Sequence, residues 1–128
     1  MSVIFLDSNV ILRYLLDDPE AASVEVLLRS RQKLVLLDIV FAEVVWTLIR
    51  FYKWDKERVI SLTSGLLNLQ SISANRKLLL SSLELYKKSN IKYTDAYIAA
   101  SMIEKKERSI YSFDRDFDKV KRIKRLEP

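Results

Sequence analysis

Apolar residues are distributed along the chain in two ways: in short continuous runs, and in longer segments where they recur every three or four positions. The runs predict strands at 3–6, 34–37, 71–73, 109–113 and 123–126. The periodic segments predict helices at 10–16, 20–31, 39–53, 56–69, 75–88 and 94–106. Asp18 and Thr94 are the expected N-caps of the second and the last helix, because their side chains accept from free backbone N–H groups.

Strands that alternate with helices imply right-handed crossovers and a parallel sheet covered on both faces. We therefore expect the α/β class, as a three-layer α/β/α sandwich with a central parallel sheet. The first run, VIFL, has the composition of a buried strand. A chain of 128 residues has the usual size of one domain, so residues 1–128 are expected to form a single domain. In such sheets, sites form at the carboxyl ends of the strands.

Composition narrows the chemistry that is possible. The chain contains no cysteine and no histidine, which excludes disulfides, zinc–thiolate sites, thiol nucleophiles and any imidazole base. Lys and Arg number 22 against 17 Asp and Glu, a net charge of +5 that suits a polyanion such as RNA but also occurs in many small proteins. No apolar stretch approaches the ~18 residues that span a bilayer. No leader peptide is recognisable before the first run, so we expect a cytoplasmic protein without a membrane segment.

Two acidic residues follow predicted strands directly. Asp7 comes after VIFL and Asp114 after SIYSF, which places both at the carboxyl edge of a parallel sheet. Asp7 can equally act as the cap of the next helix. With Asp114, the residues Asp116 and Asp118 form the pattern D-x-D-x-D, which resembles the start of a calcium-binding EF-hand loop. Lys119 and Arg125 stand where such a loop needs Gly and Glu, so we reject calcium binding. Asp116 and Asp118 are interpreted as solvated turn charges.

Two further acids lie on predicted helices. Glu43 is the only charge in the apolar segment 39–49, and a buried lone carboxylate is costly unless it is paired or binds a metal. It is therefore either a site residue or the partner of Arg13 or Arg50. Asp95 lies at a helix start, where the helix dipole stabilises a carboxylate, so a structural role is open for it too.

A common site is indicated more strongly by the four acids together than by any one of them: Asp7, Glu43, Asp95 and Asp114. Four converging carboxylates repel each other and require a cation to stay ionised. Ligand sets made only of oxygen favour Mg²⁺ or Mn²⁺. A basic chain with one concentrated acidic pocket suits metal-dependent hydrolysis of phosphodiester bonds.

Four segments carry a family resemblance: FLDSNVILRYLL at 5–16, AEVVWTL at 42–48, YTDAYIAA at 93–100 and SIYSFDRDFDKV at 109–120. In their order and spacing the chain resembles the PIN-domain ribonucleases, in particular the VapC-type toxins of toxin–antitoxin pairs. The resemblance implies a parallel α/β/α fold, a Mg²⁺- or Mn²⁺-dependent endoribonuclease, homodimers and inhibition by a small antitoxin protein.

The resemblance also assigns roles to residues. It places Asp7, Glu43, Asp95 and Asp114 on the catalytic acidic quartet, with Asp7, Asp95 and Asp114 as the metal ligands. Asn9 falls on the polar residue two positions after the first acid, and Ser112 on the small hydroxyl two before the fourth; both are interpreted as substrate contacts. Arg13, one helical turn after Asn9, is expected either to hold substrate phosphate or to neutralise the acids.

Two other classes of function stay open. A phosphatase of the haloacid dehalogenase type also carries an Asp after its first strand but needs a second Asp where this chain has Asn9. A non-catalytic RNA-binding module of the same fold is the other alternative, although none of the four acids is lost.

Two surface features complete the analysis. Lys119, Lys121, Arg122, Lys124 and Arg125 form a basic C-terminal run, either a solvated face or a rim that contacts phosphates. Four aromatic residues gather near one helix end and are expected in the core or in an oligomer interface: Trp46, Phe51, Tyr52 and Trp54.

Overall fold

The computed structural model describes residues 2–128, which form two compact units, residues 2–76 (unit 1) and Lys77–Pro128 (unit 2). The elements of unit 1 are β1 (Val3–Phe5), α1 (Ser8–Leu15), α2 (Ala21–Leu28), β2 (Lys33–Val35), α3 (Asp38–Arg50), α4 (Lys56–Leu67) and β3 (Ile72–Ser73). The remaining elements are α5 (Arg76–Lys88), α6 (Tyr93–Glu104), β4 (Ser109–Tyr111), the 3-10 helix η1 (Arg115–Lys119) and β5 (Lys124–Leu126).

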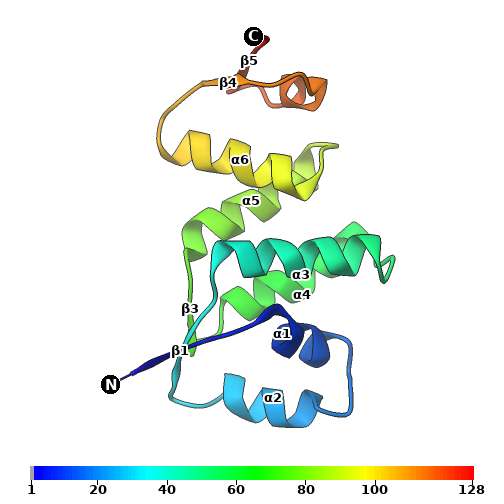
Figure 1. Cartoon of the computed structure of the whole chain (residues 1–128), viewed down its shortest axis with the longest axis vertical. Coiled ribbons are helices and arrows are strands. Elements are labelled where there is room, and N and C mark those ends of the chain that lie inside the picture. The colour runs from blue at the N-terminus through cyan, green and yellow to red at the C-terminus, as the bar shows by residue number, and fades with distance from the viewer. Residues whose placement is uncertain (1) are drawn as a thin grey trace. The chain divides into compact units, whose positions relative to one another are not determined.

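Unit 1 contains a parallel sheet in the order β1-β2-β3. Ile4 pairs with Leu34, which pairs in turn with Ile72. Figure 1 shows β1 and β3, the two outer strands of this sheet. The central strand is the buried one: Leu34 and the following Leu36 are fully covered. Of the predicted buried run 3–6, Leu6 is buried, but the prediction was wrong for the strand β1 itself. Its side chains are 44–60% exposed, because β1 is the edge of this sheet and is hydrogen-bonded on one side only within it.

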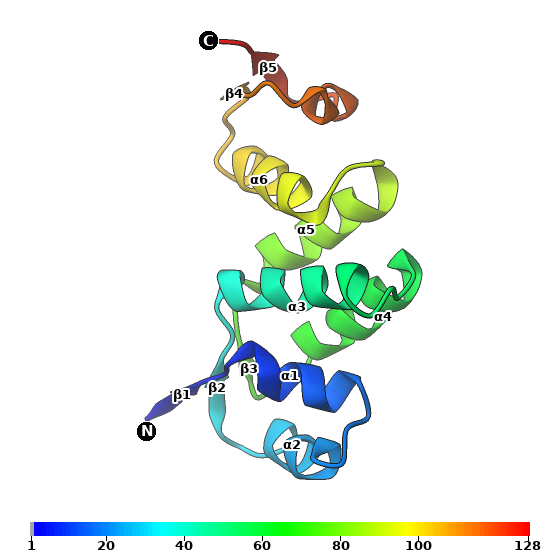
Figure 2. The same ribbon diagram turned by 45° about the vertical axis from the view of Figure 1, so that its right-hand side comes forward.

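The helices of unit 1 flank this sheet and bury one face each. α1 packs against α2 and α3, and α3 packs against α4 (Figure 2). On α3 the buried positions recur at helical spacing, as Phe41, Val44, Val45 and Leu48. The opposite face exposes Ile39, Glu43, Trp46 and Arg50, at the same spacing. α3 is therefore amphipathic in its burial although it carries few charges in its sequence.

Unit 2 combines two helices with a short parallel strand pair. α5 and α6 are linked by the hydroxyls of Ser82 and Tyr93, 2.7 Å apart, and by the edge-to-face rings of Tyr86 and Tyr93. β4 and β5 pair in parallel, with Ile110 opposite Arg125. η1 lies between these strands in the chain and packs on both β5 and α6, so the turn after β4 is held against the start of α6.

All predicted strands and helices are present, with shifted ends. The α/β class is confirmed, with a central parallel sheet flanked by helices. Two N-cap predictions were wrong. α6 begins at Tyr93 with Lys92 at its N-cap, so Thr94 lies inside the helix, and α2 begins three residues after Asp18, whose carboxylate accepts from the Glu20 N–H at 3.2 Å. That all 128 residues form one domain stays a prediction. Among the described residues, no helix has the length and apolar character needed to cross a membrane.

Candidate metal centre

Three carboxylates of unit 2 lie close together and are called the acidic cluster here. Asp95 is in the first turn of α6, Asp114 caps η1, and Asp116 is in the first turn of η1. One oxygen from each lies within 4.8 Å of the others. Asp95 and Asp114 were predicted as site residues; Asp116 was interpreted as a solvated turn charge, and its place in the cluster was missed.

The turn after β4 fixes two of these acids. The Ser112 hydroxyl accepts from the Asp114 N–H at 2.9 Å, and Asp114 Oδ1 accepts from the Asp116 N–H at 2.9 Å. Both bonds span two residues, so the sequence S-F-D-R-D folds into consecutive side-chain-capped turns. Phe117 is buried beneath them and anchors η1. Ser112 was predicted as a substrate contact; its hydroxyl here positions Asp114.

Asp95 is the least ordinary member of the acidic cluster. Its side chain is only 7% exposed, and among the described residues its Oδ2 has no hydrogen-bond partner although it is fully buried. Burial raises the pKa of the Asp95 carboxyl, and the charge of Lys92 lowers it; the charges of Asp114 and Asp116 and a side-chain hydrogen bond with Asp114 raise it further. A buried, unpaired carboxylate oxygen is costly, so this atom indicates a ligand position.

Two lysines partly offset the negative charge. Lys92 Nζ lies 3.8 Å from Asp114 Oδ2, and Lys119 Nζ lies 3.0 Å from Asp116 Oδ1. Lys119 also donates to the Asn90 carbonyl at 2.9 Å, which ties it to the loop before α6. Neither lysine reaches Asp95 Oδ2, so the compensation is incomplete where the burial is greatest.

The donor set fits a hard divalent cation. Three carboxylates without nitrogen or sulfur are the ligands that Mg²⁺ and Mn²⁺ prefer, and their positive charge would meet the unsatisfied oxygen of Asp95. Asp118 does not belong to this set. Its Oδ1 pairs with Arg125 Nε at 3.1 Å, and Arg125 also contacts Glu127.

The other predicted acids belong to unit 1. Asp7 caps α1, and its Oδ1 accepts from the Ser8 N–H at 2.7 Å, which is the capping alternative that the sequence left open. Glu43 is exposed on the outer face of α3, so the expectation that it is buried was wrong. No ion pair joins it to Arg13 or Arg50 in the part of the chain that the structure describes.

The predicted substrate contacts of unit 1 are exposed as well. Asn9 lies in the first turn of α1 with its side chain open to solvent. Arg13 pairs with Glu20 at 2.8 Å and with Asp18 at 3.7 Å, across the turn that joins α1 to α2. It therefore neutralises acids of that turn rather than the predicted site acids.

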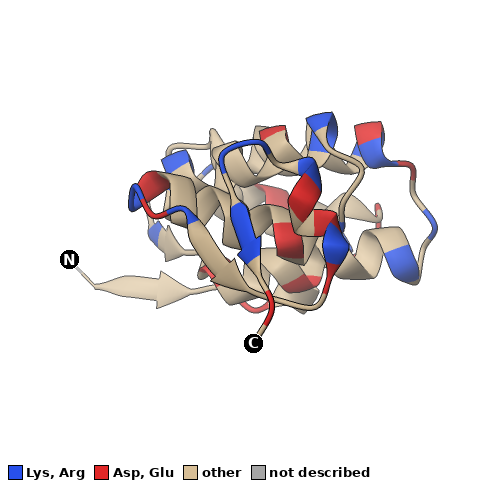
Figure 3. Ribbon diagram, turned by 90° about the horizontal axis from the view of Figure 1, so that it is seen from above, with Lys and Arg blue, Asp and Glu red and all other residues tan. Residues whose placement is uncertain are grey.

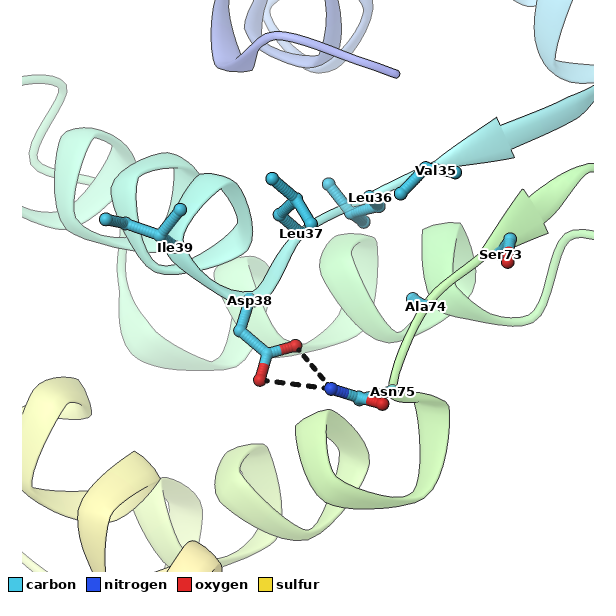
Figure 4. Close-up of a pocket in the computed structure, with 8 residues that line it drawn as sticks. All are labelled: Val35, Leu36, Leu37, Asp38, Ile39, Ser73, Ala74 and Asn75. Carbon is cyan, nitrogen blue, oxygen red and sulfur yellow. Dashed lines mark hydrogen bonds between the residues drawn. The ribbon is translucent and has the colours of Figure 1, made fainter. Parts of the chain in front are cut away.

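A polar pair that the sequence analysis did not single out lines an open pocket of unit 1. Asn75 Nδ2 donates to both carboxylate oxygens of Asp38 at 3.2 and 3.3 Å, beside apolar side chains that include Leu37 and Ile39 (Figure 4). Asp38 follows β2 and Asn75 follows β3. The same rule that selected Asp7 and Asp114, polar residues after parallel strands, would have found both.

The basic C-terminal run divides into two groups. Lys119 and Arg125 are engaged in ion pairs, whereas Lys121, Arg122 and Lys124 are exposed with no ion pair among the described residues. Figure 3 shows the basic strand β5 in blue next to the C-terminus. The three exposed cations are the members of the run that are available to a polyanion.

An all-carboxylate cluster offers the oxygen ligands that hard divalent cations prefer, and such cations support hydrolytic chemistry. The family comparison agrees: residues 4–123 match the PIN domain, and the chain belongs to the PIN domain family. PIN domains are generally nucleases. A comparison with curated proteins returned no match.

Proposed function

We propose that this protein is a Mg²⁺- or Mn²⁺-dependent endoribonuclease and the toxin of a toxin–antitoxin pair. The observation that carries the proposal is the buried, unpartnered Oδ2 of Asp95 within the acidic cluster of a PIN domain. The match to the family makes a phosphatase of the haloacid dehalogenase type the weaker alternative.

In this proposal Asp95, Asp114 and Asp116 hold the metal. When bound, such a metal lowers the pKa of a water molecule and stabilises negative charge on the phosphate. Ser112 keeps the backbone of Asp114 in place, which fixes the two acids of η1 relative to each other. Lys92 and Lys119 offset part of the repulsion among the carboxylates while no cation is bound.

Asp7 and Glu43 are proposed as further catalytic acids, Asp7 also as a metal ligand, and Asn9, Arg13 and Ser112 as substrate contacts. The support for these roles is the resemblance of their segments to the PIN-domain ribonucleases. For Asp7, Arg13 and Ser112 the structure also gives other partners, so each role needs its own test.

The proposed partners are RNA, a small antitoxin protein and a second copy of the chain, in the cytoplasm. Trp46 on α3 is 59% exposed. This supports an interface with another protein chain, because large aromatic side chains are enriched at protein–protein interfaces. Light scattering that gives the mass of a monomer across micromolar concentrations would contradict the dimer.

The test of the proposed activity uses the purified protein and an end-labelled single-stranded RNA. We expect internal cleavage with Mn²⁺, none after EDTA treatment, and none by the Asp95→Asn variant. RNA binding without cleavage would favour the non-catalytic module. Hydrolysis of p-nitrophenyl phosphate with intact RNA would favour the phosphatase.

A further inference from the structure

The loop that joins α3 to α4 exposes two adjacent aromatic rings. Phe51 is 71% exposed and Tyr52 44% exposed, and their rings meet edge to face with centroids 4.9 Å apart. Both were expected in the core or in an oligomer interface. The core interpretation was wrong, because the inner face of α3 ends at Leu48 and the chain turns away from the core after it.

The backbone of this loop is fixed although its rings are exposed. The N–H groups of Phe51 and Tyr52 both donate to the Thr47 carbonyl, at 2.9 and 3.2 Å, and the Trp54 N–H donates to the Leu48 carbonyl at 3.0 Å. Lys53 has a φ of 57°, a left-handed conformation that non-glycine residues rarely adopt. The rings are thus presented on a turn whose backbone is held by hydrogen bonds to the end of α3.

The neighbouring Trp54 is already occupied. The guanidinium of Arg58 lies over its ring, 3.7 Å from the centroid, and Asp55 caps α4 by accepting from the Arg58 N–H at 2.8 Å. Trp54 is of intermediate exposure because the Arg58 guanidinium covers one face of its ring. The aromatic surface left open by the loop is therefore that of Phe51 and Tyr52.

Two cations bracket these rings. Arg50 precedes Phe51, Lys53 follows Tyr52, and both are exposed with no ion pair in the part of the chain that the structure describes. Asp55, the nearest acid in sequence, is engaged as a cap. The segment Arg50–Lys53 thus offers two ring faces and two free positive charges within four consecutive residues.

We propose that the segment Arg50–Lys53, called the RFYK loop here, binds single-stranded RNA. Bases stack on Phe51 and Tyr52, while Arg50 and Lys53 contact the phosphates on either side. Single-strand binding sites combine these two elements, stacking platforms and a positive track for the backbone. The centre of a protein–protein interface is enriched in arginine and aromatic residues but depleted in lysine, so Lys53 is the member of the loop that favours RNA over a protein as the occupant.

This inference rests on RNA as the substrate in the proposed function but not on cleavage. It is tested by fluorescence anisotropy with a labelled single-stranded RNA in EDTA, where binding is measured without catalysis. Phe51→Leu/Tyr52→Leu removes both rings but keeps apolar side chains of similar reach. The matched control Phe51→Tyr/Tyr52→Phe exchanges the residues and keeps both rings.

We expect the leucine pair to weaken RNA binding by roughly tenfold or more, as loss of base stacking does, and the ring-keeping pair to bind like the wild type. An RNA of the same length without bases should bind the wild type and the leucine pair equally. Because both side chains are exposed, the melting temperature of each variant should match the wild type.

Arg50→Gln/Lys53→Gln gives an independent measurement. Each lost phosphate contact should lower the slope of log affinity against log salt by about 0.7. Unchanged RNA affinity in the leucine pair, or a wild type that does not bind single-stranded RNA, would overturn the proposal. Unchanged affinity with a lower mass in light scattering would assign the RFYK loop to a contact between copies of the chain. Unchanged RNA binding by the leucine pair together with normal cleavage of RNA would overturn this proposal alone and leave the proposed activity intact.

Discussion

The acids of the two units differ in what surrounds them. In unit 2, one carboxylate oxygen from each of Asp95, Asp114 and Asp116 lies within 4.8 Å of the others, and the most buried of the three has an oxygen without a hydrogen-bond partner among the described residues. In unit 1, Asp7 and Glu43 are exposed, and Asp7 is engaged in capping α1. All of these except Asp116 looked equivalent as candidates in the sequence. The difference teaches which evidence for a metal ligand is stronger. A buried carboxylate oxygen without a hydrogen-bond partner indicates a ligand position better than the location of an acid directly after a strand.

The cations near the acids differ in the same way. In unit 2, Lys92 and Lys119 approach the acidic cluster but leave Asp95 Oδ2 unpaired. In unit 1, Arg13 is engaged by Asp18 and Glu20 of its own turn. The first arrangement leaves negative charge at Asp95 that a divalent cation would relieve.

Replacing Asp95 should have the largest effect. Asp95→Asn keeps the size of the side chain but removes a charge on which the affinity for a hard cation depends. We expect Mn²⁺-dependent cleavage of RNA to fall by more than about 100-fold, beyond the loss seen when residues that merely support metal ligands are changed. The measurement is the initial rate of cleavage of end-labelled RNA. Cleavage within a few-fold of the wild type would make Asp95 a structural residue of α6.

The pair Asp116 and Asp118 sharpens the comparison within η1. Asp116→Asn should lower cleavage by at least about tenfold, because it removes a proposed metal ligand. Asp118→Asn is the matched control: it lies two residues on, pairs with Arg125 and lies outside the acidic cluster. It should retain the wild-type rate. Equal rates for the two variants would show that the gathering of three oxygens has no catalytic meaning.

Asp7→Asn tests the unit 1 acids. Asparagine caps helices about as well as aspartate, so the free energy of unfolding should change by well under ~1 kcal/mol. If Asp7 is a catalytic acid, as proposed, cleavage should nevertheless fall by about tenfold or more. Asp55→Asn, at the N-cap of α4, serves as the control for a cap without a catalytic role. Undiminished cleavage by the Asp7 variant would leave capping as its function.

The exposed cations of the C-terminal run should give the smallest effect. Changing Lys121, Arg122 and Lys124 together to Gln should weaken RNA binding and flatten its salt dependence, by about 0.7 in slope for each lost phosphate contact. Anisotropy at a series of salt concentrations measures this. An unchanged slope would identify the three side chains as an ordinary solvated surface.

Much of the local structure could be predicted because it depends on local patterns. Apolar runs and helical spacing located every strand and α-helix but not the 3-10 helix η1, and the position after SIYSF located Asp114. Which face is covered is not a local property. The run VIFL and the aromatic rings of residues 46–52 look like core in sequence, yet β1 is a sheet edge and the rings lie on the outer face and at the end of α3.

Asp116 and Asp118 show the same limit at the candidate site. They alternate in D-x-D-x-D, and no pattern distinguishes them. The 3-10 turn of η1, anchored by the buried Phe117 between them, brings Asp116 to Asp95 and leaves Asp118 to Arg125. Which of the two acids joins Asp95 depends on the packing of η1 against α6, two elements that are separated in the sequence. A single sequence does not reveal such a contact.

The central claim is that the acidic cluster is a metal site. The electrostatics of the cluster predict the direction in which Asp95→Asn changes stability, and this direction can be measured without an activity assay. The pKa of the Asp95 carboxyl is raised in the folded protein, chiefly by burial. Its ionisation therefore destabilises the metal-free fold at neutral pH, and this cost is relieved as the pH falls through the raised pKa. Asp95→Asn should melt at a higher temperature than the wild type at pH 7.5, with the advantage lost below the ordinary pKa of a carboxyl.

The most direct test is the melting temperature of the wild type and of Asp95→Asn at pH 7.5 as Mn²⁺ is added. We predict that the melting temperature of the wild type, the less stable protein without metal, rises with Mn²⁺ and continues to rise with the logarithm of its concentration above the dissociation constant. At a hundredfold excess over that constant, the folded state should gain about 2.7 kcal/mol. The melting temperature of Asp95→Asn should be higher than that of the wild type without metal and should change little as Mn²⁺ is added. An equal rise in both proteins, or no rise in the wild type, would contradict the assignment of the acidic cluster as the metal site.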